Sequence, residues 1–243
     1  LEAFLLEETR DAYGAIISVD TLLYGGIVPS RLHHLEAGVV EKRLELLRKI
    51  KENNPRIKIY AFALIMRTPQ GNNASEEPEY YQTYGLNIYL SGHFQNKKEL
   101  GIITKEERER EARLEIPEEV LKDYLDRRSQ NVYFNLATLA YVEDGTIDFL
   151  IIPQDDASEY GYAAMDQQKV RKAIKEKRLQ SKVYMYPGAD EVGCTLAARF
   201  LNLVRDFTPK VYVKYPSSTS ATVVPCLEDR YLATTIEYQI LAA

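Results

Sequence analysis

Short apolar runs alternate along the chain with longer stretches in which apolar residues recur every three or four positions. The short runs predict β-strands, because apolar segments of this length bounded by polar or turn residues are typical of buried strands. They span residues 15–19, 57–66, 149–152, 182–186 and 210–215. The stretches between them predict amphipathic helices. The clearest helical stripe is formed by Val40, Leu44, Leu47 and Ile50.

This alternation predicts an α/β fold with a mostly parallel sheet, because parallel strands need a crossover, usually a helix, between them. We expect part of a (β/α) barrel, with a doubly wound open sheet as the alternative. Five strands cannot close an eight-stranded barrel, so residues 1–243 are expected to be a single α/β domain from a longer protein. Residues at about 68–145 interrupt the rhythm and predict a helical insertion, in which Thr104 to Glu107 fits a capping box.

The run Phe149 to Ile152 is unbroken by polar residues and predicts a strand that is buried on both faces. Pro153 has no N–H group to donate, so we expect the strand to end there and the next residues to lie in a loop. Asp155 and Asp156 follow at once. Successive side chains of a regular strand point to opposite faces, so a turn between them is needed to bring both carboxyl groups into one pocket. We predict that turn.

Two carboxyl groups in one pocket cannot both ionise cheaply, so one pKa is expected to rise and that group can act as an acid near neutral pH. Such a pair suits glycosidic cleavage. For adjacent residues we favour substrate assistance, in which one acid orients the 2-acetamido group of the sugar as nucleophile and the other protonates the leaving oxygen. In the structural alternative, Asp155 caps a helix and Asp156 pairs with an arginine.

Polar residues also follow other predicted strands. We expect a substrate-binding cleft lined by Asp20, Arg67, Tyr160, Asp190 and Glu191. The acids among them leave two alternatives open, since Asp and Glu are also common in the first turn of a helix and their oxygens can bind Mg²⁺ or Ca²⁺. Two alternative functions therefore stay open: a divalent-cation-dependent hydrolase, and a non-catalytic sugar-binding or scaffold domain.

The composition narrows the classes of partner. The net charge is −5, from 31 basic and 36 acidic residues, and no basic stripe is present, which argues against nucleic-acid binding. No apolar run approaches the roughly 20 residues that span a bilayer, so no membrane partner is expected. Cys194 and Cys226 show no zinc-site or disulfide spacing, which favours a reducing cytoplasm. The sequence leaves the oligomeric state open.

Several sequence blocks together resemble an uncharacterised bacterial family, a domain of unknown function whose members are about twice as long as this chain. The blocks lie at residues 18–26, 28–31, 65–67, 76–78, 116–128, 152–156, 186–193 and 228–230. The resemblance covers nearly the whole chain and implies no activity. It implies that the chain is an internal portion that lacks an N-terminal strand and a C-terminal half.

The Asp155-Asp156 pair alone is similar to the catalytic pair of barrel glycoside hydrolases that cleave N-acetylhexosaminides with substrate assistance. This resemblance implies that Asp155 orients the acetamido group and that Asp156 is the general acid. The leading hypothesis is therefore a cytoplasmic glycoside hydrolase. It would act without a cofactor on a small-molecule or oligosaccharide substrate that contains a 2-acetamido sugar.

Overall fold

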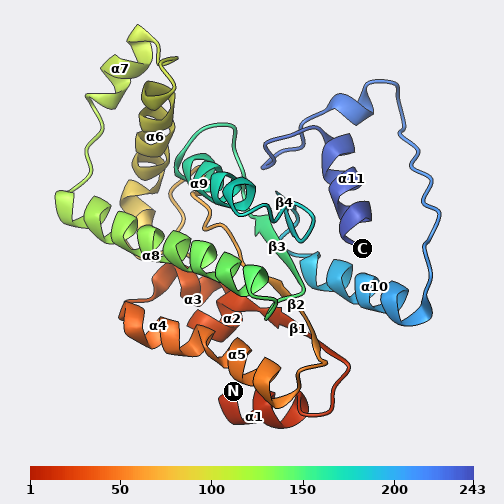
Figure 1. Ribbon diagram of the computed structural model, residues 1–243. Coiled ribbons are helices and arrows are strands. Elements are labelled where there is room, and N and C mark those ends of the chain that lie inside the picture. Colours follow the sequence, from red (N-terminus) through yellow and green to blue (C-terminus); the bar gives the residue numbers. More distant parts are fainter.

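A four-stranded parallel sheet lies at the centre of the computed structural model, which describes residues 1–243 (Figure 1). The strands are β1 (Gly14–Ser18), β2 (Lys58–Phe62), β3 (Phe149–Gln154) and β4 (Val183–Pro187). They lie side by side in the order β1-β2-β3-β4, and every neighbouring pair is parallel. The predicted α/β fold with a parallel sheet is confirmed, and closure into a barrel stays a prediction.

Helices connect the strands and extend beyond them. They are α1 (Glu2–Glu8), α2 (Val19–Tyr24), α3 (Ile27–Leu32), α4 (Ala37–Leu44), α5 (Leu46–Asn53), α6 (Tyr81–Glu99), α7 (Lys105–Glu111), α8 (Glu118–Glu143), α9 (Tyr162–Glu176), α10 (Val192–Arg205), the 3₁₀ helix η1 (Ser220–Thr222) and α11 (Leu232–Ala242). The predicted stripe from Val40 to Ile50 is fully buried, but it belongs to two helices that meet at Glu45. No helix has the length and apolar character needed to cross a membrane.

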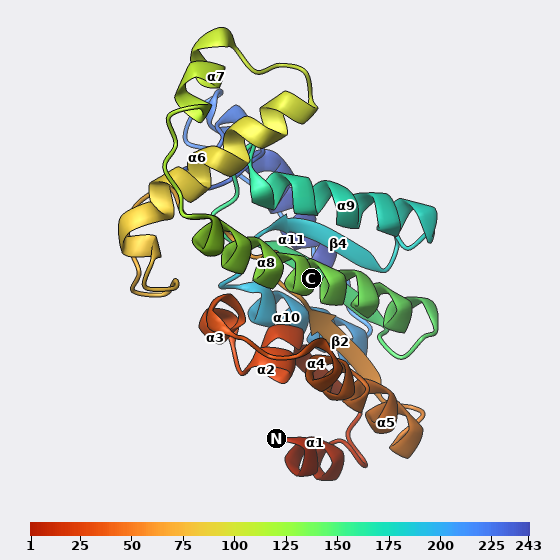
Figure 2. The ribbon, with the colours of Figure 1, turned by 90° about the vertical axis from the view of Figure 1, so that its left-hand side faces the viewer.

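Both faces of the sheet are covered. On one face, 28 buried residues form a core between the strands and helices α2, α4, α5, α8 and α9. On the other, a smaller core of 7 buried residues joins the strands to α10 and α11. Figure 2 shows α8 and α9 in front of the sheet and α10 behind it.

Strand β3 contributes to both cores, and all six of its residues are buried. Leu150 and Ile152 belong to the larger core, whereas Phe149 and Ile151 belong to the smaller one. This division follows from the alternation of side chains along a strand. The prediction of a strand buried on both faces is confirmed.

The stretch between β2 and β3 contains α6, α7 and α8. The predicted capping box is present at the start of α7, where the side chains of Thr104 and Glu107 each accept the other residue's backbone N–H. The second half of α8 packs on the sheet, because Phe134, Leu139 and Val142 belong to the larger core. This part of α8 therefore serves as the crossover between β2 and β3.

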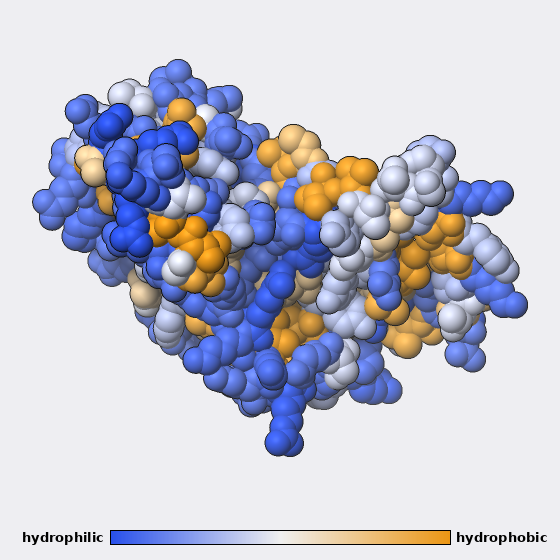
Figure 3. Space-filling view, turned by 90° about the horizontal axis from the view of Figure 1, so that it is seen from above, coloured by the Kyte–Doolittle hydropathy of each residue, from blue (hydrophilic) through white to orange (hydrophobic).

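The fifth predicted strand, at residues 210–215, is not formed. This segment pairs with no other strand, and Tyr212 is 84% exposed. Its sequence pattern fits a strand, but a strand also needs a free sheet edge with which to exchange backbone hydrogen bonds. Beside β4 that place is taken by α11. Figure 3 shows apolar residues exposed at the right, over the C-terminal part of the chain. The exposed apolar residues of this part of the chain include Val211, Val213, Val223, Val224 and Leu227.

Helices α6 and α9 approach each other closely at Gly92. A Cβ atom on Gly92 would lie 2.5 Å from Cδ2 of Tyr162, the first residue of α9. The hydroxyl groups of Ser91 and Tyr162 share a hydrogen bond of 2.9 Å. One residue earlier, the N–H of Gly161 donates to Oδ1 of Asn96 at 3.2 Å. Helix α6 therefore holds the end of the loop that follows β3.

This close approach gives a prediction for stability. Gly92→Ala is expected to destabilise the protein by about 1–3 kcal/mol, because the new methyl group forces the buried Tyr162 ring or the helix to shift. Gly38→Ala in α4 is the matched control, since a Cβ there meets nothing within 4 Å, and it should be neutral or stabilise by up to about 1 kcal/mol. Urea unfolding midpoints measure both effects. Equal midpoints for the two variants would contradict the close packing.

Candidate functional site

Strand β3 ends one residue later than the sequence predicts. Pro153 cannot donate to a neighbour, but its carbonyl oxygen accepts the N–H of Ile65 at 3.1 Å. Gln154 also pairs, in register with Pro187 of β4. A proline removes only a donor, so pairing through its carbonyl continues. Asp155 and Asp156 are therefore the first residues beyond the strand.

The backbone turns at the acidic pair. Asp156 has a φ of 42°, in the left-handed region that asparagine and aspartate adopt more readily than most residues. As a result, both carboxylates contact one guanidinium: Nη1 of Arg67 lies 3.6 Å from Oδ2 of Asp155 and 3.2 Å from Oδ2 of Asp156. The predicted turn is present, and it brings the two acids together.

A second arginine, Arg31, binds one member of the pair, Asp155. Nη2 of Arg31 donates to Oδ2 of Asp155 at 2.6 Å, and its side chain is only 2% exposed. Nη1 of Arg31 lies 3.1 Å from Oε2 of Glu76 and 3.4 Å from Oε1 of Glu77. The guanidinium of Arg31 thus joins a helix, a loop and the end of β3.

Arg67 binds the same two glutamates. Its Nη2 lies 2.8 Å from Oε2 of Glu76, and its Nε lies 2.8 Å from Oε1 of Glu77. We call the resulting group of six side chains the arginine-carboxylate cluster. Its members are Arg31, Arg67, Glu76, Glu77, Asp155 and Asp156.

The topology explains why these residues meet. Arg31 lies in the last turn of α3, after the turn at Gly25 and Gly26, whose φ values of 97° and 148° favour glycine. Arg67 follows β2, and the acidic pair follows β3. Parallel strands place their carboxyl ends at one edge of the sheet, which is the usual position of ligand sites in such folds.

Asp20 lies next to the cluster without contacting it directly. Its carboxylate is buried and accepts the N–H of Leu64 at 2.8 Å, which ties the end of β1 to the segment after β2. Burial raises the pKa of Asp20 to about 6, although the hydrogen bond from Leu64 and the charge of Arg31 partly oppose this rise. Asp20 therefore holds together the two chain segments that lie beside the cluster.

The three other predicted site residues, Asp190, Glu191 and Tyr160, are not members of the cluster. Asp190 follows β4, and its charge contributes to the raised pKa of Asp155. Oε1 of Glu191 instead accepts a hydrogen bond from Gln239 of α11. The hydroxyl of Tyr160 donates to Glu159 at 2.7 Å, and its ring lies against His93 and Lys97 of α6. The structure thus brings Arg67, Asp155 and Asp156 together, with Asp20 and Asp190 nearby.

The sequence did not identify the glutamates of the cluster as site residues. Glu76 and Glu77 lie in the loop before α6, outside any predicted strand end. The available signal was that two adjacent acids lie nine and ten residues after Arg67 and can pair with it. Only the fold shows that Arg31 reaches the same two acids.

Burial and crowding raise proton affinity in the cluster. The pKa of Asp155 is raised by burial first and by the charge of Asp156 second, against the lowering effects of Arg67 and Arg31. Burial also raises the pKa of Glu77, again against both arginines. Burial would lower the pKa of Arg67, but its ion pairs with Glu77 and the two aspartates raise it overall. Arg67 thus stays charged while the buried acids gain affinity for a proton.

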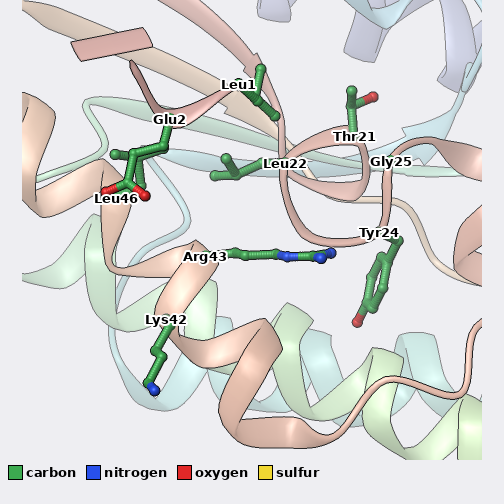
Figure 4. A pocket seen from close by; sticks show the side chains of 9 residues that line it. All are labelled: Leu1, Glu2, Thr21, Leu22, Tyr24, Gly25, Lys42, Arg43 and Leu46. Atoms are coloured by element: carbon green, nitrogen blue, oxygen red, sulfur yellow. The ribbon is translucent and has the colours of Figure 1, made fainter. Parts of the chain in front are cut away.

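The structure has a separate cavity of about 460 Å³ between α1, α2 and α4 (Figure 4). It is lined by Leu1, Glu2, Thr21, Leu22, Tyr24, Gly25, Lys42, Arg43 and Leu46. None of these residues belongs to the arginine-carboxylate cluster. No three His, Cys, Asp or Glu side chains of the molecule are arranged to hold one metal ion.

Comparisons with known proteins give one match. The model of a protein family described as "Protein of unknown function (DUF4127)" matches residues 1–243. No curated protein and no solved structure matches the chain. The predicted resemblance to an uncharacterised family is confirmed, and these comparisons show no similarity to glycoside hydrolases.

The burial of Asp20 predicts a pH effect on stability. Its pKa of about 6 lies above the ordinary value of 3.8, so the folded state holds a proton that the unfolded chain releases, and this contribution is lost as the pH rises between these values. Asp20→Asn places a side chain there that is neutral at every pH in this range. Its free energy of unfolding relative to that of the wild type should therefore increase by up to about 3 kcal/mol between about pH 4 and pH 7.

Urea unfolding of both proteins across this pH range measures the difference. The exposed substitution Asp11→Asn controls for the removal of one negative charge. A constant difference between Asp20→Asn and the wild type at all pH values would contradict the raised pKa.

Removing a buried arginine from the cluster is expected to lower the stability of the protein strongly. Arg31→Met is expected to destabilise the protein by about 3–5 kcal/mol, because it removes the more deeply buried of the two counter-ions of Glu77 and Asp155 and leaves them only Arg67. The control is Arg113→Met, which removes an exposed arginine that makes no ion pair. Urea unfolding at neutral pH measures both changes, and similar losses would show that the Arg31 ion pairs contribute little.

Proposed function

Since the chain belongs to the family of unknown function DUF4127, whose description names no reaction, we propose its function from the site alone. We propose a carbohydrate-active enzyme, a glycoside hydrolase that acts on a 2-acetamido sugar with the help of Asp155 and Asp156. The substrate is a small glycoside or an oligosaccharide. Cys194 and Cys226 are both free and exposed, which suits a cytoplasmic enzyme.

One observation carries the proposal: two adjacent carboxylates at the carboxyl end of β3 share the guanidinium of Arg67. Both side chains are partly exposed, 23% for Asp155 and 20% for Asp156, so a ligand can reach them. Each uses one oxygen on the arginines and keeps the other available. Paired acids of this kind are the usual catalytic groups in glycoside hydrolysis.

The contacts support different roles for the two acids. Asp155 is held by both arginines through Oδ2, which fixes its orientation. A fixed carboxylate can accept the N–H of a substrate acetamido group and direct the acetamido carbonyl oxygen toward the anomeric carbon. Asp156 has one ion pair, with Arg67, and is the freer group to deliver a proton to the leaving oxygen.

The proton affinity of Asp155 depends on its neighbour Asp156. They are close enough for the charge of Asp156 to raise the pKa of Asp155. In this proposal, the proton that Asp155 holds moves away when the acetamido N–H binds to that carboxylate, and Asp156 is the neighbouring group that can take it and deliver it to the leaving oxygen.

The remaining predicted residues take supporting places in this proposal. Arg67 positions both acids, and Asp20 fixes the neighbouring strand ends through Leu64. Asp190 lies on the side of β4 and can contact a bound sugar. As proposed, the reaction needs no cofactor, because the nucleophile is the substrate's own acetamido oxygen.

The proposal predicts a specific pattern of activity. The purified protein should cleave 4-nitrophenyl 2-acetamido-2-deoxyglycosides at least about 100-fold faster than the matching glycosides with a 2-hydroxyl group, which lack the internal nucleophile. Asp155→Asn should lower kcat by about 10²–10⁴-fold for every leaving group. Asp156→Asn should cost less with 4-nitrophenol, which leaves without much protonation, than with a sugar leaving group.

The exposed substitution Asp126→Asn in α8 is the control and should match the wild type. Activity that is lost with EDTA and restored by Mg²⁺ or Ca²⁺ would favour the cation-dependent alternative. The hydrolase proposal fails if no acetamido glycoside is cleaved, or if both active-site variants keep full activity.

A further inference from the structure

Every carboxylate of the arginine-carboxylate cluster binds the arginines through one oxygen only. The bound atoms are Oε2 of Glu76, Oε1 of Glu77 and Oδ2 of both Asp155 and Asp156. The other oxygen of each group accepts no hydrogen bond from the protein. Glu76, Asp155 and Asp156 are partly exposed and can offer their free oxygen to a ligand, whereas the free oxygen of Glu77 is buried.

Two polar atoms of the cluster are buried without any partner. They are Oε2 of Glu77, whose side chain is 1% exposed, and Nε of Arg31, whose side chain is 2% exposed. An unpaired buried donor or acceptor costs about 1–3 kcal/mol. The missing partner of Glu77 is a hydrogen-bond donor, and that of Arg31 is an acceptor, so the interior of the cluster is not fully satisfied by the protein alone.

The cluster also carries more negative than positive charge. When all groups are ionised, two guanidinium groups face four carboxylates, which leaves a net charge of −2. Asp190 lies near enough for its charge to affect Asp155. A positively charged ligand with several N–H donors would balance this excess.

The geometry favours an ammonium group over a metal ion as the source of that charge. Metal ions need several ligand oxygens that converge on one point at about 2.0–2.6 Å, and no three acidic side chains are so arranged here. An ammonium group instead donates three hydrogen bonds in diverging directions at about 2.7–3.0 Å. Separate oxygens around a shallow site can accept these bonds.

We infer that the arginine-carboxylate cluster binds a primary amine, and that the oligosaccharide substrate carries an unsubstituted 2-amino sugar next to the 2-acetamido sugar that is cleaved. The second part rests on the proposed function. Glu76 is half exposed and keeps Oε1 free, so it lies at the rim, where a neighbouring sugar would reach. Sugar hydroxyl groups can donate to the remaining carboxylate oxygens.

Calorimetric titration with two tetrasaccharides tests the inference. One consists of β-1,4-linked glucosamine, and the other is the matching glucose tetramer, which has a hydroxyl group in place of each amine. Neither has an acetamido group, so binding is measured without turnover and independently of the hydrolase proposal. At about pH 6 the glucosamine tetramer should bind about tenfold more tightly or better, equivalent to one charged hydrogen bond.

Two matched variants locate the binding. Glu76→Gln removes one rim charge of the cluster and should weaken binding of the glucosamine tetramer about tenfold, while binding of the glucose tetramer stays unchanged. Glu79→Gln removes an exposed acid three residues away that lies outside the cluster, and it should leave both affinities at the wild-type value.

Three results would overturn the inference: no binding of the glucosamine tetramer, equal affinity for the two tetramers, or equal losses in Glu76→Gln and Glu79→Gln. The last result would show general attraction to an acidic protein. Failure of the proposed function would be seen in a different experiment, as the absence of cleavage of acetamido glycosides.

Discussion

The buried guanidinium of Arg31 is the contact on which the site depends. It joins α3, the loop before α6 and the end of β3 through ion pairs to Glu76, Glu77 and Asp155. A charge this deeply buried is tolerated only when it is paired, because losing its hydration costs several kcal/mol. The three segments must therefore stay together, and the position of the acidic pair follows from their assembly.

The parallel sheet explains why such an assembly forms at this edge. Each strand ends at the same side, so the polar residues that follow β1, β2 and β3 are brought together although they are far apart in sequence. Asp20 strengthens this edge by accepting the N–H of Leu64. On the far side, the loop after β3 is held by Asn96 of α6 and by the packing of Tyr162 on Gly92. The acidic pair lies between two supported segments.

The charge balance gives the site its chemical character. Two arginines are enough to hold four carboxylates in place, but they do not neutralise them. Burial raises the proton affinity of Asp155 and Glu77, so bound protons can neutralise part of this excess negative charge. A site of this kind favours protons, ammonium groups and hydroxyl donors over anions. That preference supports the proposed carbohydrate ligand and the proposed acid catalysis by the aspartate pair.

The sequence by itself determined the features that depend on local periodicity. Apolar runs and stripes specified four of the strands, the α/β class and the doubly buried β3, because the periods of strands and helices can be recognised from residues close in sequence. The capping box at Thr104 was recognised from an equally local pattern, Thr104 with Glu107 three residues later. The acidic pair was visible for the same reason. Tertiary structure alone decided which charges meet, since Arg31 and Asp155 are 124 residues apart. It also left residues 210–215 unpaired and extended β3 through Pro153, because strand formation depends on the edge a neighbour offers as well as on the segment's own sequence.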